Sequence, residues 1–226
     1  MGSTPPQDRR TDSDRRIAFD RLIDWVIGIA LGIIGFVAGL GGWGLYSISD
    51  RSEIATLIHN SEFQSEVLTE AEVIDALAIL SDWVGIGLIV TGGILFTLGL
   101  AVVIAHHRAR SRGRITPRWI VSVVGAIVGL VLAFIPFSPT IGGAVAGYLD
   151  PEYRSSGAAA GALSGIFGTL PALIIGAFGS FGLIRGLPDD VAVPVVVVIA
   201  IALLIIAVYQ IALGAIGGYV GNWIRE

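Results

Sequence analysis

The chemistry open to this chain is limited by what its apolar segments lack. Five long runs contain no Asp, Glu, Lys, Arg or His: Trp25–Tyr46, Trp83–Ala105, Trp119–Leu149, Gly157–Ile184 and Val191–Ile224. Each is at least as long as the about 20 residues that a membrane span needs. Proton relays, voltage sensors and most ion-coupled carriers place ionisable groups at membrane depth. The sequence therefore argues against a proton pump and against intramembrane acid–base or metal catalysis.

Polar side chains within these runs are mainly hydroxyls. They include Thr91, Thr97, Ser122, Ser164 and Thr169. A hydroxyl often donates to the backbone of its own helix, so these residues need no functional explanation. Gln210 needs a partner across a helix interface. We interpret it as a contact between helices and not as part of a ligand site.

No catalytic, cofactor or metal site can be assembled from the remaining residues. His106 and His107 are adjacent, and neighbours on a helix point about 100° apart, so they chelate one metal poorly. No glycine segment forms a phosphate loop followed by Lys and Ser or Thr. Cysteine is absent, which excludes a thiolate ligand or nucleophile. The sequence predicts a protein that is not an enzyme and has no cofactor.

The composition is that of a membrane protein. Hydrophobic residues make up 54% of the chain and charged residues 14%, with a mean hydropathy of +0.81. A soluble domain has about 25% charged residues. All 14 basic residues are arginine, and 18 acidic residues outnumber them. Carboxylates stay hydrated in concentrated salt, where screening weakens their repulsion, so this lysine-free composition is typical of a halophile.

The five runs predict an all-α polytopic transmembrane helix bundle with about five spans. All five tryptophans lie at or near run ends: Trp25, Trp43, Trp83, Trp119 and Trp223. Tryptophan concentrates at the two membrane–water interfaces. The tryptophans therefore support the span boundaries independently of hydropathy.

Arginines predict the orientation. Five precede the first run, and five follow the second: Arg108, Arg110, Arg112, Arg114 and Arg118. The segment between these runs holds one arginine and eight acidic residues. Because cytoplasmic loops carry the excess of basic residues, we expect the protein in the cell membrane with a cytoplasmic N-terminus. Five crossings then put the C-terminus outside, although Arg225 favours the inside. The five loop arginines are candidates for lipid headgroup contact.

Three regions are expected along the chain. Residues 1–16 are polar and contain proline, so we expect a disordered cytoplasmic N-terminus. Residues 17–118 form a two-span helical hairpin with an acidic outer segment (47–82) and a basic cytoplasmic loop (106–118). Within the outer segment we expect a short helix around 50–59 and a capping box at Thr69–Glu72. Residues 119–226 form a glycine-rich three-span domain with a broken helix.

The third run is too long for one straight helix. It would extend about 44 Å, against about 30 Å for the hydrocarbon core. Pro136 and Pro139 each remove a backbone donor and clash with the preceding turn. We therefore predict a helix break at Pro136, Ser138 and Pro139, with helices at 119–135 and 139–149 and Ser138 as the N-cap of the second. The sequence leaves open whether 139–149 completes a span or is re-entrant. Pro171 is expected to kink the fourth span.

Glycines recur on single helix faces. The predicted helix-packing positions are Gly142, Gly143, Gly157, Gly161, Gly165, Gly217 and Gly218, and a similar stripe is Gly28, Gly32, Gly35 and Gly39. Small residues let helix backbones approach closely in lipid. Packing within the chain is the first interpretation, oligomerisation the second, and lining of a solute path the third. Two similar segments, 141–149 and 216–224, are interpreted as parallel repeats.

A resemblance supports this interpretation of the C-terminal half. In the segment 136–171, "PFSPTIGGAVAGYL" is followed by a short polar turn and by "GAAAGALSGIFGTLP". This pattern resembles a haloarchaeal family of small glycine-rich multi-pass membrane proteins of unknown function. The resemblance covers about residues 119–226. It implies a proline-interrupted span followed by a glycine-rich span, and it implies no activity.

Two functions stay open at this point. The first is a structural or accessory membrane component that packs through its glycine faces. The second is a channel or carrier for a small neutral solute, with the Pro136–Thr140 break near the path, because a broken helix frees backbone carbonyls at depth. A break that borders a water-filled cavity favours the second function, and a break filled by neighbouring helices favours the first. The expected partners are the lipid bilayer and either further copies or a membrane-protein complex; no nucleic acid is expected.

Overall fold

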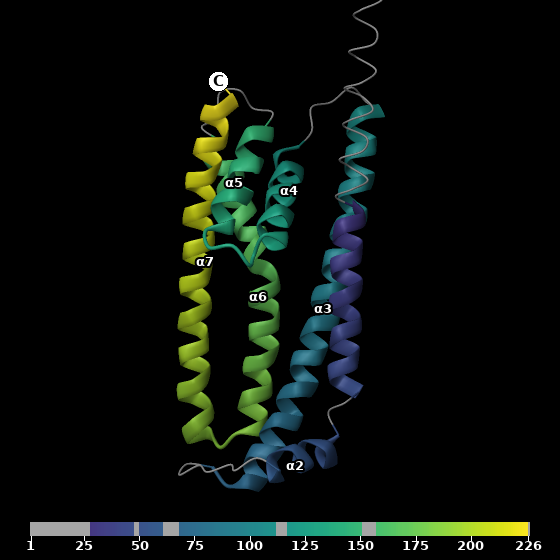
Figure 1. The fold of residues 1–226 in the computed structure, drawn as a ribbon, viewed down its shortest axis with the longest axis vertical. Coiled ribbons are helices and arrows are strands. Elements are labelled where there is room, and N and C mark those ends of the chain that lie inside the picture. The colour runs from purple at the N-terminus through teal and green to yellow at the C-terminus, as the bar shows by residue number, and fades with distance from the viewer. Residues whose placement is uncertain (1–27, 48–49, 61–67, 112–116, 151–156, 226) are drawn as a thin grey trace, which may run out of the picture.

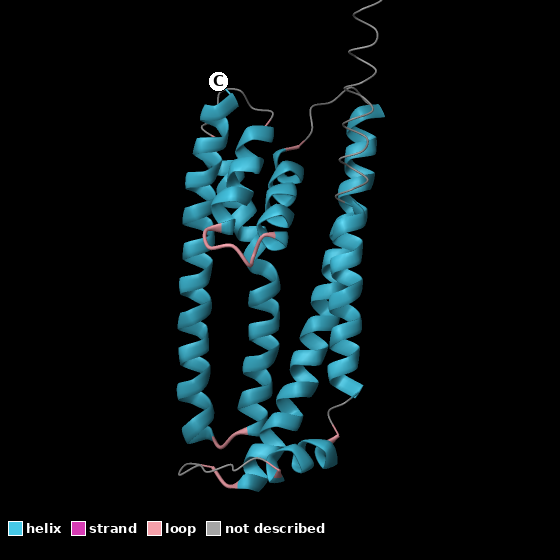
Figure 2. Cartoon of the chain, in the orientation of Figure 1, coloured by secondary structure: helices cyan, strands magenta, loops and turns pink. Residues whose placement is uncertain are grey.

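The computed structural model describes residues 28–47, 50–60, 68–111, 117–150 and 157–225, and their regular elements are all α-helices (Figures 1 and 2). In chain order they are helix Gly28–Ser47, α2 (Arg51–His59), α3 (Glu70–Ser111), α4 (Arg118–Val131), α5 (Ser138–Leu149), α6 (Ala158–Gly186) and α7 (Asp189–Arg225). Four of the described helices are long and apolar enough to cross a membrane, and α4 is a shorter apolar helix. The predicted all-α bundle with about five apolar segments is confirmed.

The helices form an elongated bundle with two distinct ends (Figure 1). Helix Gly28–Ser47 and α3 lie side by side, and α6 and α7 extend along the other side. α4 and α5 occupy only the half of the bundle that contains the end of α7. We call the end at which α7 stops the C-terminal end, and the end crossed by α2 the α2 end.

The third apolar run reverses direction. The contacts of Gly125 with Gly142 and Ala146, and of Gly129 with Ser138, show that α4 and α5 are antiparallel. Arg118 and Asp150, at the two ends of this pair, form a salt bridge. α4 and α5 are therefore a re-entrant hairpin that enters and leaves at the C-terminal end. The C-terminus lies at the same end as Arg118, so the expectation that five crossings put it opposite the 106–118 loop is wrong.

Local geometry explains the reversal. α4 has 14 residues, which extend only about 21 Å. Between α4 and α5 the loop 132–137 makes successive tight turns, in which Ile135 donates to Leu132 and Ser138 donates to Ile135 at 2.8 and 3.2 Å. Phe137 adopts the left-handed conformation, with φ of 66°, and is the N-cap of α5. A break is present at Pro136, but α4 ends at Val131 and not at the predicted 135. Ser138 and Pro139 are the first two residues of α5, so Ser138 is not its cap.

Helix α2 and the start of α3 follow their local signals. Asp50 caps α2 by accepting a hydrogen bond from the Ser52 amide at 3.0 Å, which holds the pKa of Asp50 below its ordinary value. Thr69 and Glu72 form the predicted capping box, because the Thr69 amide donates to Glu72 at 2.8 Å and the Glu72 amide donates to the Thr69 hydroxyl at 3.4 Å. Two side-chain contacts connect α2 to α3: the ion pair Arg51–Asp75 at 2.8 Å, and a contact between His59 Nδ1 and Glu70 Oε1 at 2.5 Å.

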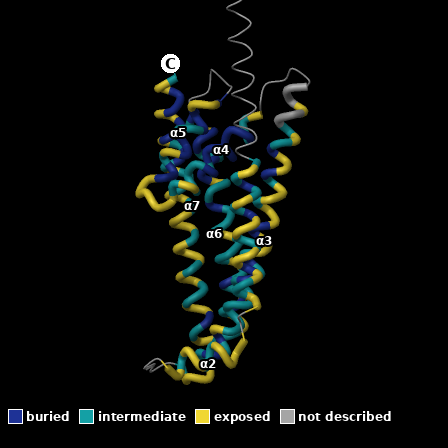
Figure 3. The backbone as a smooth tube through the Cα atoms, turned by 45° about the vertical axis from the view of Figure 1, so that its right-hand side comes forward, coloured by how far each residue is buried: buried dark blue, intermediate teal, exposed yellow. Residues whose placement is uncertain are grey.

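The core lies in the part of the bundle next to the C-terminal end, where buried residues gather around α4 and α5 (Figure 3). Leu31, Val102 and Val123 are almost fully buried and join helix Gly28–Ser47, α3 and α4 in one cluster. Nearer the α2 end, Trp83 of α3 stacks edge-on against Phe181 of α6, with ring centroids 4.4 Å apart. Pro171 lies inside a continuous α6, and its kink stays a prediction.

Helix Gly28–Ser47 packs on α3 through glycines that recur every seven residues. The backbone pairs are Gly28 with Gly99, Gly35 with Gly92, and Gly42 with Gly85. A Cβ at Gly32 or Gly39 would meet nothing within 4 Å. Of the predicted stripe, Gly28 and Gly35 therefore lie on the packing face, whereas Gly32 and Gly39 direct no Cβ position at α3.

Some predictions concern parts that are not described. Residues 1–16, Arg112 and Arg114 lie outside the described residues, and so do the side chains of His106, His107 and Arg110.

Candidate functional site

Glycine contacts hold the re-entrant hairpin against α7. Gly143 and Gly147 of α5 face the backbone of Gly214 and Gly218 of α7, and Gly217 and Gly221 of α7 face Thr140 and Ala144 of α5. A Cβ at Gly143, Gly147, Gly217 or Gly221 would lie within 3.0 Å of backbone atoms, which real Cβ atoms do not tolerate. Because partners on both helices advance together along the chain, α5 and α7 are parallel. The segments 141–149 and 216–224 thus pack on each other.

The same face of α7 also contacts α6. Gly161 faces Gly214, Gly157 faces Gly218, and Gly165 faces the backbone of Gln210. Gly157 has a φ of 66° and caps α6. All seven glycines proposed as packing positions therefore lie against another helix of the same chain, Gly142 doing so against Gly125 of α4. These faces are occupied without a second protein.

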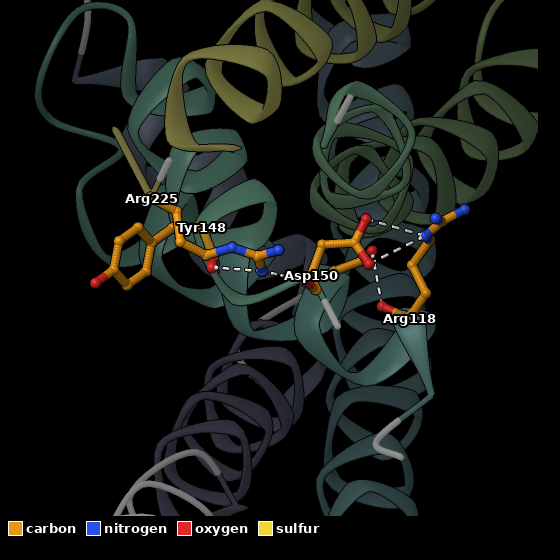
Figure 4. A network of polar contacts seen from close by, with 5 residues as sticks. Arg118, Tyr148, Asp150 and Arg225 are labelled. Carbon is orange, nitrogen blue, oxygen red and sulfur yellow. Dashed lines mark hydrogen bonds and ion pairs between the residues drawn. The ribbon is translucent and has the colours of Figure 1, made fainter. Parts of the chain in front are cut away.

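A charged cluster joins the two ends of the hairpin to the end of α7 (Figure 4). We call Arg118, Asp150 and Arg225 the end cluster. The Asp150 carboxylate is fully buried and lies 3.2 Å from Nε of Arg118. Arg225 donates to the backbone carbonyls of Asp150 and Tyr148. The cluster joins three chain segments that are distant in sequence. Arg118, which the sequence analysis named as a candidate for lipid headgroup contact, pairs with Asp150 instead.

Sequence reasoning misses this role of Asp150 and Arg225. From the sequence, Asp150 only ends a helix, and Arg225 is only a weak orientation signal. One signal is present: an acidic residue directly follows an apolar run whose first residue, Trp119, directly follows an arginine. An ion pair between the two ends of one run requires the run to turn back.

A cavity of about 50 Å³ lies at the tip of the hairpin. We call it the tip cavity. Four helices line it, with α4 contributing Gly125 and Gly129, α5 Ser138, Pro139 and Gly142, α6 Ser164, Gly165 and Gly168, and α7 Gln210. The helix break predicted from Pro136, Ser138 and Pro139 thus borders a cavity. Because the tip of the hairpin lies between the two ends of the bundle in Figure 1, the tip cavity is at neither end.

The polar groups of the tip cavity are unusual. Ser164 is 3% and Ser138 8% exposed. Within the described residues, neither hydroxyl forms a hydrogen bond with the protein, nor does the side chain of Gln210. The buried hydroxyls of Thr91 and Thr169, by contrast, donate to carbonyls four residues earlier at 2.7 Å. The expectation that buried hydroxyls donate to their own helix therefore holds at Thr91 and Thr169 and fails at Ser164. Gln210, expected to bond across a helix interface, lines the cavity instead.

This arrangement suits an uncharged guest that forms hydrogen bonds. A buried hydroxyl without a partner costs about 1–3 kcal/mol, so Ser138 and Ser164 favour an occupant that satisfies them, and the half-buried Gln210 can add a further hydrogen bond. The residues that line the tip cavity include no acidic or basic side chain. Among the described residues no group of three or more His, Asp or Glu is placed to hold a metal. The site can therefore bind and orient a neutral molecule, but its residues supply no acid or base.

A second, smaller cavity lies beside the first. It measures about 20 Å³ and is lined by apolar residues of helix Gly28–Ser47, α3, α4 and α6, including Leu31, Leu98 and Phe167. We call it the apolar cavity. Ala126, Leu130 and Gly168 belong to the walls of both cavities. These three residues are all that the two linings share.

Comparison with known proteins places only the C-terminal part of the chain. Residues 119–224, slightly less than half of it, match a family of unknown function, DUF5518. The matched part contains α4 to α7 except for Arg118 and Arg225, and with them the whole lining of the tip cavity. It agrees with the resemblance found over about residues 119–226. No curated protein and no solved structure is similar enough to count as a match.

Proposed function

We propose that this membrane protein is a channel or carrier for a small neutral solute and that the tip cavity forms part of the path. One observation carries the proposal: the break in the third apolar run borders a cavity whose polar side chains, Ser138, Ser164 and Gln210, have no hydrogen-bond partner in the described part of the chain. Irregular backbone at membrane depth is tolerated where it is buried in protein or lines a water-filled cavity. A re-entrant hairpin with a polar cavity at its tip meets that condition.

Flux through liposomes tests this proposal. The purified chain is reconstituted at high salt, since its acidic, lysine-free composition favours a halophilic source, and permeation of water, urea and glycerol is followed by stopped-flow light scattering. We expect permeation of at least one of the three above that of protein-free liposomes. Permeabilities equal to those of protein-free liposomes for all three probes contradict the proposal.

A matched pair of variants connects the flux to the tip cavity. A Cβ at Gly168 meets nothing within 4 Å, so Gly168→Leu fills the cavity without a backbone clash. Gly93 of α3 is equally open and is exposed, so Gly93→Leu adds the same side chain to the outer surface. We expect Gly168→Leu to lower the flux about tenfold or more, because a filled cavity leaves no room for a solute. Gly93→Leu should leave the flux unchanged, and equal effects of the two variants would separate the flux from the cavity.

A structural or accessory role is the second candidate. The apolar outer face of α7 supports it, since Val193, Val197, Ile201, Leu204 and Val208 are each at least half exposed. A partner would use this face and not the glycines, which are occupied within the chain. Purification from native membranes in mild detergent at high salt, followed by mass spectrometry, separates the two roles. A stoichiometric partner supports the accessory role, and recovery of the chain alone contradicts an accessory role in a complex with another protein.

The proposal includes an orientation in the cell membrane. The N-terminus and the basic loop 106–118 face the cytoplasm, where the loop arginines contact anionic headgroups. Arg108 is exposed, as such a contact requires, whereas Arg118 is held by Asp150. Enzymatic activity and cofactors form no part of the proposal.

A further inference from the structure

We infer that the tip cavity is a hydrated binding site for an uncharged molecule of a few non-hydrogen atoms, and that Gly168 sets the size of the molecule it admits. This inference rests on the proposed solute path and deepens it, because it names the class of ligand and the residue that limits it. Three properties of the tip cavity support it: its hydration, the absence of charged residues from its wall, and the open space beside Gly168.

The hydration follows from Ser164. This side chain is 97% buried, as its exposure of 3% gives, and it lines the tip cavity together with Ser138 and Gln210. A cavity with about 10–15 Å³ of space accessible to water holds one molecule if polar partners are present. The tip cavity has about 50 Å³. It therefore holds more than one water molecule, or a solute that replaces them.

The tip cavity has no charged residue in its wall, and this excludes ions as ligands. The wall consists of glycine, alanine, leucine and proline apart from its three polar residues, and none of these can neutralise an ion. Burial of an uncompensated ion costs several kcal/mol even after the protein relaxes. The hydroxyls and the carboxamide can both donate and accept hydrogen bonds. The ligand is therefore a neutral molecule with at least one hydrogen-bonding group.

The glycines that line the tip cavity differ in what a side chain at each position would contact. A Cβ at Gly125, Gly142 or Gly165 would lie within 3.0 Å of the backbone of another helix, so these glycines hold helices together. A Cβ at Gly168 meets nothing within 4 Å, and Gly168 lines both the tip cavity and the apolar cavity. A methyl group at this position therefore meets no neighbouring helix, and a larger side chain extends from the wall of the two cavities.

Cysteine labelling tests the inference, because the chain has no native cysteine. Ser164→Cys is made in the full chain, reconstituted in liposomes and treated with methyl methanethiosulfonate, which is small and neutral, or with the cationic trimethylammonium-ethyl analogue. The thiolate attacks the thiosulfonate sulfur, a disulfide forms and sulfinate leaves, so the reaction requires water that lets the thiol ionise. Intact-mass spectrometry measures the rate. Gly93→Cys is the control, since Leu95, two residues further along α3, lines the apolar cavity together with Gly168, which puts Gly93 at a similar depth.

The expected results are specific. Ser164→Cys reacts with the neutral reagent about tenfold or more faster than Gly93→Cys, because a lipid-facing thiol stays protonated, and it reacts slowly with the cationic reagent. Adding Gly168→Leu to Ser164→Cys slows the neutral reagent about tenfold, since the cavity is filled, whereas adding Gly93→Leu has no effect. Gly168→Ala, which adds a single methyl group, gives an intermediate rate and serves if the leucine variant does not fold.

Each contrary result removes a defined part of the inference. If Ser164→Cys reacts no faster than Gly93→Cys, although both react after denaturation, the cavity is not hydrated. Equal rates with the neutral and cationic reagents contradict the selection against charge. A rate that neither Gly168→Leu nor Gly168→Ala changes contradicts the size limit. If the neutral reagent labels Ser164→Cys rapidly but the protein conducts none of the tested solutes, the tip cavity is a binding site and the proposed solute path is wrong.

Discussion

Glycine residues of this chain fall into two groups that are separated by what a side chain would meet. A Cβ at Gly147 would lie closer than 3.0 Å to the carbonyl and Cα atoms of Gly218, whereas a Cβ at Gly32 would point into open space. Both glycines lie within helices, so helix propensity alone gives alanine the same small advantage at each. The difference between them is therefore a pure packing effect.

Substitution of these two glycines tests that difference. Gly147→Ala forces α5 and α7 apart, and overpacking of this kind costs about 1–3 kcal/mol of unfolding free energy. Gly32→Ala should change the unfolding free energy by less than about 1 kcal/mol, or raise it slightly. Denaturant titration in detergent, followed by circular dichroism, measures both. Equal stability of the two variants would contradict the close approach of α5 and α7.

The ion pair between Asp150 and Arg118 gives a second prediction. The buried carboxylate of Asp150 pairs with Arg118, whose side chain is 25% exposed, so loss of either partner leaves a charge with poor compensation. Asp150→Asn and Arg118→Gln should each lower the unfolding free energy by about 1–3 kcal/mol. The double variant should lose less than the sum, because the second change removes a charge that the first left unpaired. A double-mutant cycle measures the coupling, and additive losses contradict a direct interaction.

The behaviour of the helices as elements shows what the sequence could predict. The capping box at Thr69–Glu72, the short helix α2 and the break around Pro136 depend on neighbours in sequence, and all three are present. The direction taken after the break does not depend on neighbours. Hydropathy is satisfied equally by a bent span and by a hairpin, and the choice is made by contacts between Gly125 and Gly142 and between Arg118 and Asp150.

The hairpin predicts that the start of α4 and the end of α5 lie on the same side of the membrane. Pro117, before α4, and Tyr148, near the end of α5, are both exposed at the C-terminal end, whereas Ser52 lies in α2. Single cysteines at these positions in the cysteine-free chain are treated with a membrane-impermeant maleimide in oriented vesicles. Pro117→Cys and Tyr148→Cys should react from one side and Ser52→Cys from the other. Reaction of Pro117→Cys and Tyr148→Cys from opposite sides is the result expected of a straight span, and it would contradict the hairpin.

At the scale of the whole molecule, the candidate site was only partly predictable. Spacing of four residues identified Gly157, Gly161 and Gly165 as one face, because helical periodicity is a local property. Spacing of seven residues between Gly28, Gly35 and Gly42 became meaningful only with Gly85, Gly92 and Gly99 opposite. The tip cavity is assembled from four helices, and no segment by itself shows that Ser164 and Gln210 face it. A site that exists only between elements leaves no local pattern.

The charges of the molecule also separate by end once the hairpin is taken into account. The C-terminal end carries the exposed Arg108 and the end cluster with Arg118 and Arg225. The α2 end carries the acidic first turns of α2, α3 and α7, which contain Glu53, Glu70, Glu72, Asp189 and Asp190. Its arginines are engaged, Arg51 with Asp75 and Arg185 over the rings of Trp83 and Phe181. An even number of crossings brings the basic residues of distant segments to one membrane face.

This separation predicts that the C-terminus faces the cytoplasm. Basic residues near span ends favour the cytoplasmic side, and Arg225 then agrees with the 106–118 loop and does not oppose it. A fluorescent protein that matures only in the cytoplasm, fused after Glu226, should be bright, and an alkaline phosphatase that is active only outside should be inactive there. The same reporters placed between Asn60 and Leu68, at the α2 end, should give the opposite pattern. An active phosphatase at the C-terminus would contradict this orientation: it would mean either an odd number of crossings, which the antiparallel packing of α4 and α5 does not allow, or an N-terminus outside the cell.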